Sequence, residues 1–161
     1  MGPQVSLRPT TDADLDFLCR VYASTRTEEL RATDWSEEQK AAFLRMQGEA
    51  QHRYYRESYA GASWDVVLVD GRPAGRLYLV EWESELRLID IALLPEFRNA
   101  GAGSRLLRAL MDRAAAAGKP LTIHVERFNP ALRLYAQLGF VVAADDGGVY
   151  LRLEWTPPPG G

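Results

Sequence analysis

The sequence predicts one α+β domain in which helices pack against a central sheet. Its apolar residues follow a period near 3.6 in some segments and near 2 in others, which indicates helices and strands without an internal repeat. Two turn signals, Asp70-Gly71 and Asp145-Asp146-Gly147-Gly148, lie between strand-like segments and predict antiparallel hairpins. We expect about seven strands and about four helices, so that most of the sheet is antiparallel.

The length and composition are those of a single globular domain. With 161 residues, of which 47% are hydrophobic and 25% charged, the chain can bury one sizeable core. We assign residues 1–156 to this domain and expect the Pro/Gly-rich end, 157–161, to be disordered. The net charge of −3 with scattered basic residues predicts no nucleic-acid partner, and no apolar run would span a membrane. The single Cys19 excludes an internal disulfide and is compatible with the cytoplasm, where we expect the protein.

The first third of the chain predicts one strand and two helices. Residues 5–8 are strand-like, and Thr10-Thr11-Asp12 supplies helix-start chemistry before apolar residues at helical spacing. Ser36 and Gln39 have the spacing of a capping box, so a second helix is expected over about 37–59. A glycine near its middle could kink this helix. The residues expected along its buried stripe are Phe43, Met46, Ala50 and Tyr54.

From residue 64 the period changes to that of a sheet. Strands are expected at 64–69, 73–82, 86–94, 121–126, 140–143 and 149–155. A helix follows Gly103 and ends at Gly118, where glycine favours a helix C-terminus. Asn129 with Pro130 has the pattern of an N-cap, and Gly139 ends the helix that they begin.

The segment after the strand at 86–94 has the character of an anion site. It reads Arg98-Asn99-Ala100-Gly101-Ala102-Gly103-Ser104 and leads directly into a helix. Glycines let the backbone approach a ligand, and a helix start presents unpaired N–H groups at the positive end of the helix dipole. These features favour phosphate oxygens. The residue order fits neither a Walker loop nor a dinucleotide-binding βαβ unit.

Two segments together resemble the signature motifs of the GNAT superfamily of acetyl-CoA-dependent N-acetyltransferases. Residues 93–103 are similar to its Arg/Gln-x-x-Gly-x-Gly/Ala pyrophosphate loop, and residues 129–140 to its segment ending in Leu-Tyr-x-x-x-Gly-Phe. The order of expected strands and helices also agrees over nearly the whole chain. The resemblance implies a three-layer fold with a mixed, mostly antiparallel sheet. It further implies direct transfer of an acetyl group from acetyl-CoA to a primary amine, without a metal.

The resemblance also implies a coenzyme site. The pyrophosphate would lie on the loop amides, with Arg98 entering the loop and Asn99 tolerating left-handed backbone angles. The strand before the loop would diverge from its neighbour and pair with the pantetheine arm. The residues implied in coenzyme binding are Ile91, Ala92, Leu93, Arg98, Asn99, Ala100, Gly101, Ala102, Gly103, Ser104, Asn129 and Tyr135. The family often has Arg or Lys where this chain has Ala100, a charge that Arg105 or Arg108 could partly replace.

Catalysis needs a neutral amine, a polarised thioester and a proton for the departing thiolate. By resemblance Tyr135 donates that proton, although its helical spacing also fits a core position. Three residues are candidates for the general base that removes the amine proton, and each could instead have a structural role. His124 matches a base of some protein N-terminal acetyltransferases and has a suitable pKa, and Glu126 lies on the same strand face. Asp90 stands in an apolar strand, so it is either catalytic or a buried hydrogen-bond anchor.

The sequence leaves the amine acceptor open. Residues available to line its pocket are Tyr22, Arg26, Trp35, His52, Tyr54, Tyr55 and Trp82. This set favours a small amine or a peptide end, and Glu81 could hold a cationic acceptor. One alternative is a protein N-terminal or lysine acetyltransferase. Another is a non-catalytic acyl-CoA sensor or interaction domain. The last strand, 149–155, could pair across a homodimer.

Overall fold

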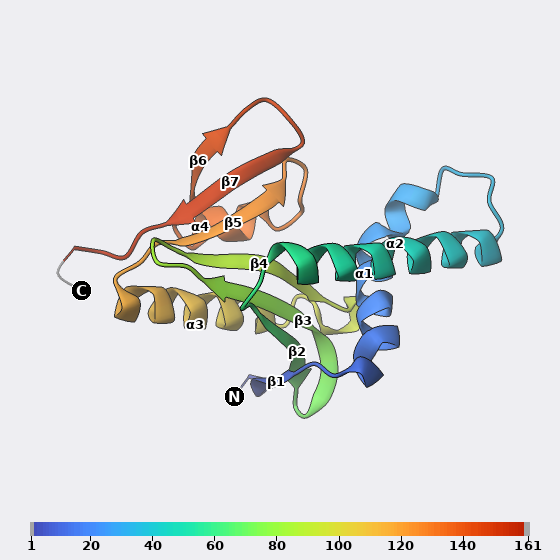
Figure 1. Ribbon diagram of the computed structural model, residues 1–161, viewed down its shortest axis with the longest axis horizontal. Coiled ribbons are helices and arrows are strands. Elements are labelled where there is room, and N and C mark those ends of the chain that lie inside the picture. Colours follow the sequence, from blue (N-terminus) through green and yellow to red (C-terminus); the bar gives the residue numbers. More distant parts are fainter. Residues whose placement is uncertain (1, 160–161) are drawn as a thin grey trace.

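The computed structural model describes residues 2–159, which form one seven-stranded sheet with helices packed on it (Figure 1). The strands are β1 (Val5–Pro9), β2 (Ser63–Val69), β3 (Arg72–Glu81), β4 (Leu86–Leu93), β5 (Leu121–Glu126), β6 (Val141–Asp145) and β7 (Tyr150–Trp155). The helices are α1 (Leu15–Leu30), α2 (Glu37–Ser58), α3 (Ala102–Ala117) and α4 (Leu132–Gln137), with 3-10 turns η1 (Asp12–Asp14) and η2 (Pro95–Phe97). Of the tail expected to be disordered, residues 160–161 lie outside the described part.

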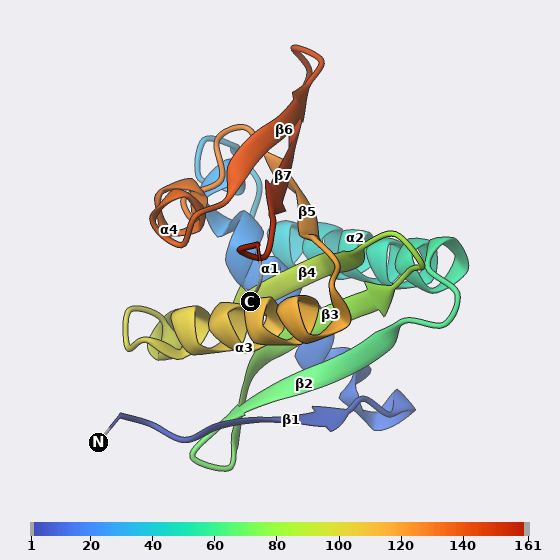
Figure 2. The same cartoon turned by 90° about the vertical axis from the view of Figure 1, so that its left-hand side faces the viewer.

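The strand order is β1-β2-β3-β4-β5-β7-β6, and β4–β5 is the parallel pair in an otherwise antiparallel sheet. Figure 2 shows α3 on one side of β3 and β4, with α1 and α2 on the other. On the α3 side, apolar side chains of α3, α4 and five strands form the largest core cluster. A smaller cluster joins α1 to β3 and β4 on the other side. The predicted three-layer fold with a mixed, mostly antiparallel sheet is therefore confirmed.

Local signals place most element ends where the sequence predicts them. The Ser36 hydroxyl accepts from the Gln39 amide (3.1 Å), and the Gln39 side chain accepts from the Ser36 amide (2.8 Å). This reciprocal pair starts α2 one residue later. Asp70 and Gly71 both have positive φ, 51° and 79°, as the tight β2–β3 hairpin requires. Gly118 ends α3 in the left-handed conformation.

The predicted buried stripe of α2 is largely wrong. Three of its members are exposed: Met46, Ala50 and Tyr54. Leu44 and Gly48 face inward instead, together with polar side chains that bond to α1 and the sheet: Gln47, Gln51 and Tyr55. Because this helix buries polar groups, hydrophobicity alone selects the wrong face. Gly48 does not interrupt the helix; a Cβ there would lie 3.3 Å from the Cys19 sulfur, so glycine lets α1 and α2 approach closely.

The C-terminal part differs from the prediction in two ways. The Asn129 side chain accepts from the Ala131 amide (2.7 Å), but α4 begins only at Leu132, with Ala131 as its N-cap. Asn129 therefore closes a turn before the helix instead of capping it. In addition, β7 is paired with β5 on one side and β6 on the other, so it has no free edge for a homodimer. The strand at that end of the sheet is β6, whose residues are all exposed.

Candidate functional site

The parallel strands β4 and β5 diverge at their carboxyl ends (Figure 1). Their pairing starts at Leu86 and stops at the pair Leu88–Ile123, whereas β4 continues to Leu93 and β5 to Glu126. The backbone of the last residues of β4 is therefore unpaired on the side that faces β5 within the described chain. An edge of free N–H and C=O groups can bind an extended amide-containing ligand as an added strand. The divergence expected from the resemblance is present.

A β-bulge marks the point of divergence. Leu88 pairs with Leu79 and Asp90 pairs with Tyr78, so Ile89 has no opposite residue on β3. A bulge bends its strand and redirects the side chains that follow. Ile89 packs with Tyr78 on the α1 side of the sheet as a result. The bulge thus coincides with the end of β4–β5 pairing.

The glycine loop leads from β4 into α3 in an open conformation. Asn99 has φ 63° and Gly101 φ 87°, the left-handed angles that these residue types tolerate. Gly101 is the N-cap of α3 without any side-chain capping bond, and the first helical bond runs from the Arg105 amide to the Gly101 carbonyl (3.1 Å). A Cβ added to Gly101 or Gly103 would meet nothing within 4 Å. The amides of 102–104 therefore form an uncapped, unobstructed helix start, which suits a phosphate anion.

Arg98 joins this loop to the end of β4. Its Nε donates to the Leu93 carbonyl (2.8 Å), and its Nη2 donates to the Ser24 hydroxyl on α1 (3.3 Å). The side chain therefore holds three segments together instead of projecting freely into the loop.

The two arginines expected to replace the charge missing at Ala100, Arg105 and Arg108, both lie on α3. The Arg105 guanidinium donates to the carbonyl of Pro3, near the start of the chain, and is engaged there. Arg108 is exposed on α3 and stays a candidate.

Tyr135 projects from α4 into the main core, where its residue is 3% exposed. Its ring packs edge-on against Phe140, with centroids 5.5 Å apart. No described residue forms a hydrogen bond with its hydroxyl. Burial raises the pKa of this phenol, and the nearby Asp90 carboxylate raises it further. Tyr135 therefore stays protonated at neutral pH, as a proton donor must.

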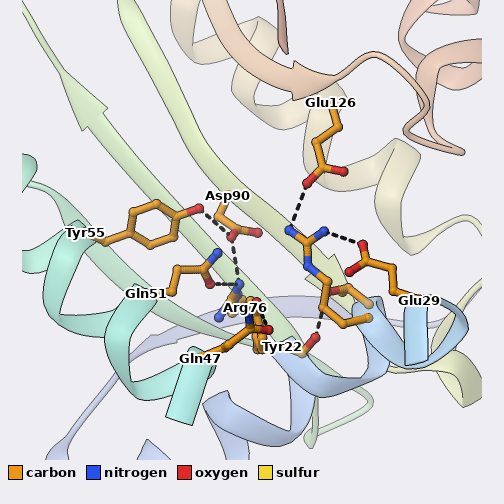
Figure 3. A network of polar contacts seen from close by, with 10 residues as sticks. Tyr22, Glu29, Gln47, Gln51, Tyr55, Arg76, Asp90 and Glu126 are labelled. Atoms are coloured by element: carbon orange, nitrogen blue, oxygen red, sulfur yellow. Dashed lines mark hydrogen bonds and ion pairs between the residues drawn. The ribbon is translucent and has the colours of Figure 1, made fainter. Parts of the chain in front are cut away.

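Asp90 lies in a buried polar network between the sheet and α2 (Figure 3). Arg76 Nη2 donates to Asp90 Oδ2 (2.7 Å) and to the Gln51 side-chain oxygen (2.7 Å). The Tyr55 hydroxyl donates to the same Asp90 oxygen (3.1 Å). The carboxylate in an apolar strand thus has the partner that its burial requires.

Arg76 and Gln51 belong to this network, although no sequence motif identified them. Arg76 is 5% exposed in the middle of β3, in the strand adjacent to Asp90. The available signal for Arg76 was that it and Asp90 are opposite charges in the two apolar strands of one predicted hairpin. A buried charge needs a partner, so the two residues could have been predicted to form an ion pair. No comparable signal pointed to Gln51.

His124 lies on the exposed face of β5, opposite Arg152 on β7. Partial burial lowers its pKa below the ordinary 6.5, and the positive charges of Arg87 and Arg152 lower it further. The imidazole is therefore neutral at pH 7 and able to accept a proton.

Glu126, at the end of β5, forms an ion pair with Arg26 of α1 (2.9 Å). Arg26 also pairs with Glu29 (2.8 Å) and lies over the Tyr22 ring. This contact ties α1 to β5 on the side of the sheet where Asp90 lies (Figure 3).

The residues expected to line an acceptor pocket do not all come together. Tyr22, Arg26 and Tyr55 lie in or beside the network of Figure 3. The others lie elsewhere: Trp35 against Phe43, Trp82 against Tyr59, His52 in a separate hollow beside η1, and Tyr54 exposed on α2. Glu81 is paired with Arg113 and Lys119. A hollow of about 550 Å³ forms a groove between α1 and α2 and includes none of the loop residues.

Residues 25–140 match the family model described as "Acetyltransferase (GNAT) family". This match covers more than half of the chain. The chain belongs to the GNAT acetyltransferase family. The matched range contains the diverging strands, the glycine loop and α4. No curated protein sequence matches the chain. The family thus agrees with the resemblance seen in the sequence.

Several solved structures share this GNAT fold at low sequence identity. The PaiA N-acetyltransferase of Thermoplasma acidophilum in complex with coenzyme A is 20% identical, covers 95% of this chain and 99% of its own, and has a TM-score of 0.70. The ribosomal-protein-S18-alanine N-acetyltransferase of Escherichia coli is 20% identical, covers 98% and 97%, and has a TM-score of 0.62. Ard1 of Thermoplasma volcanium is 20% identical, covers 96% and 98%, and has a TM-score of 0.61. None of the described helices of the present chain is long and apolar enough to cross a membrane.

Proposed function

We propose that the protein is an N-acetyltransferase that moves an acetyl group from acetyl-CoA directly to a primary amine. One observation carries the proposal: β4 is unpaired with β5 after Leu88, and the end of this free edge, at Leu93, packs against the cluster that contains Ala102 at the uncapped start of α3. A backbone edge and an anion seat so close together fit a ligand with an amide-rich arm and a diphosphate, which describes coenzyme A. The family match and the coenzyme A complex of a fold relative support the same ligand.

The coenzyme would be held mainly by backbone groups. The amides of 101–104 would hold the pyrophosphate, and Asn99, Ala100 and Arg98 would shape the loop around it. Ile91, Ala92 and Leu93 would pair with the pantetheine arm. Asn129 would contribute through the turn that precedes α4. When bound, the coenzyme supplies the thioester whose acetyl group is transferred.

Two side chains of the protein would transfer the two protons of the reaction, one to the thiolate and one from the amine. The amine nitrogen attacks the thioester carbon, and the carbon–sulfur bond breaks. Tyr135, kept protonated by burial, would give its proton to the departing thiolate. His124, neutral because its pKa is lowered, would accept the proton that the amine loses. The other two candidate bases, Glu126 and Asp90, are each held in an ion pair with an arginine.

The acceptor is a small-molecule amine or the amine of a peptide or protein. The network on the α1–α2 side offers carboxylates, guanidinium groups and tyrosine hydroxyls, a mixture that suits an amine carrying further polar groups. We propose further that residues 1–156 form one domain. A cytoplasmic location, compatible with the buried free Cys19, is part of the same proposal.

The test is an assay of thiol release from acetyl-CoA over aminoglycosides, amino acids, polyamines and peptides, preceded by calorimetric titration with acetyl-CoA. Binding together with amine-dependent thiol release supports the proposal. Binding without release for any amine class would indicate an acyl-CoA sensor instead. Absence of binding would reject the coenzyme site itself.

A further inference from the structure

The bulge that opens the β4–β5 gap lies next to a buried ion pair anchored on α2. We propose that Arg76, through Asp90, is a positioning residue that holds the free edge of β4 in the geometry needed by the pantetheine arm. Gln51 and Tyr55 of α2 complete the anchor. This inference rests on the proposed function, since it concerns how the same coenzyme site is kept open.

The first argument is the place of the pair in the sheet. Asp90 is the first residue after the bulged Ile89, and it pairs with Tyr78. Arg76 is two residues from Tyr78 and pairs with Ala92. The Arg76–Asp90 ion pair is therefore a diagonal contact that spans the first residues of β4 beyond the bulge. Diagonal neighbours on one sheet face are within reach of long side chains.

The second argument is that these residues lack the support of a second neighbouring strand. Beyond Leu88 the backbone of β4 pairs with β3 alone. On β3, Gly75 permits a close approach, because a Cβ there would lie 2.1 Å from the Ala92 carbonyl oxygen. β3 thus supports the free edge of β4, and the ion pair fixes Asp90 to β3. Without it, this part of β4 could relax toward β5 and narrow the gap.

The third argument is energetic. Arg76 is almost fully buried, and its Nε is one of two buried side-chain atoms without a hydrogen-bond partner among the described residues. Burying a charged pair is costly, and apolar residues of similar volume often stabilise a fold equally well. A network of this kind is better explained by the conformation that it specifies than by the stability that it adds. The conformation that it specifies here is the bulge.

The experiment compares two ligands and two matched variants. Acetyl-CoA uses the whole site, whereas 3′-phospho-ADP, the nucleotide half of coenzyme A, lacks the pantetheine arm. Asp90→Asn removes the charge beside the bulge. Glu85→Gln is the control, because Glu85 is also a shielded carboxylate paired with an arginine, Arg87, but lies before β4 where pairing with β5 is intact.

We expect Asp90→Asn to weaken acetyl-CoA binding by about tenfold while 3′-phospho-ADP binding stays within about twofold. Glu85→Gln should leave the ratio of the two affinities unchanged. An equal loss for both ligands, or no loss for either, would overturn the positioning role. If the native chain binds neither ligand, the proposed coenzyme site fails first, which is a distinguishable result.

A milder variant covers the case in which Asp90→Asn does not fold. Tyr55→Phe keeps the ring and removes only the hydroxyl that donates to Asp90. Its loss should be smaller, about threefold, and again confined to acetyl-CoA. A Tyr55→Phe protein that folds as the native chain does and binds both ligands with native affinity would count against the network.

Discussion

Arg98 Nε lies 2.8 Å from the carbonyl oxygen of Leu93, so the residue that begins the glycine loop is bonded to the last residue of β4. The same guanidinium reaches the Ser24 hydroxyl of α1. One side chain therefore fixes the angle between the free strand edge and the helix start. We therefore expect the hydrogen-bond geometry of Arg98, as well as its charge, to affect coenzyme binding.

Substitutions at Arg98 can separate these two contributions. Gln keeps an N–H donor for the Leu93 carbonyl, and Leu removes it, while both remove the charge. We expect Arg98→Gln to retain acetyl-CoA affinity within about threefold and Arg98→Leu to lose about tenfold or more by calorimetry. If both variants lose equally, and the native affinity falls steeply with salt, then charge attraction to the phosphates is the main role.

Tyr135→Phe should separate chemistry from binding. The hydroxyl has no hydrogen-bond partner among the described residues, so its removal should not lower the melting temperature. We expect turnover to fall by about 10²-fold or more, with the dissociation constant of acetyl-CoA within about twofold of native. Tyr150→Phe, at an exposed position of β7, is the control and should change neither. Parallel losses of turnover and affinity would mean that the hydroxyl is structural.

Gly101 and Gly118 permit a matched test of the anion seat. Both have positive φ, both flank α3, and a Cβ on either would meet nothing within 4 Å. Replacement by Glu therefore imposes a similar backbone cost on each, on the order of 1 kcal/mol. Gly101→Glu should abolish acetyl-CoA binding, because it adds bulk and negative charge where phosphates are expected. Gly118→Glu should bind normally; a comparable loss there would attribute both effects to strain.

The elements were predictable because their boundaries are encoded locally. Ser36 and Gln39 form their reciprocal bonds within one helical turn, and Asp70-Gly71 closes a hairpin from its own backbone preferences. The α3 glycines act in the same way. None of these signals depends on what packs against the element, so sequence patterns alone place seven strands and four helices among the described residues.

What packs on each element was less predictable. The buried side of α2 carries Gln51 and Tyr55, which are polar because they serve Arg76 and Asp90, so the apolar pattern selected the opposite side. The position of β7 inside the sheet also depends on register and not on local propensity. For the site, the motifs predicted the loop and the diverging strands. The ion pair beside the bulge required the three-dimensional pairing of β3 with β4.

The pH dependence of turnover tests His124 as the base. Its pKa is lowered, so the neutral, proton-accepting form persists below pH 6.5. We expect the acidic limb of the kcat profile to have its midpoint below 6.5, and His124→Gln to remove that limb.

The positive charge of Arg152, opposite His124, provides a sharper test of His124 as the base. A positive charge disfavours imidazolium, so removing one raises the pKa of His124 and moves the limb to higher pH. Arg152→Met should therefore shift the midpoint upward, since Arg152 is one of the charges that lower this pKa. Arg53→Met, an exposed arginine on α2 that does not act on His124, is the control and should leave the midpoint in place. If Arg152→Met does not move the midpoint and the acidic limb persists in His124→Gln, the base is a group other than His124.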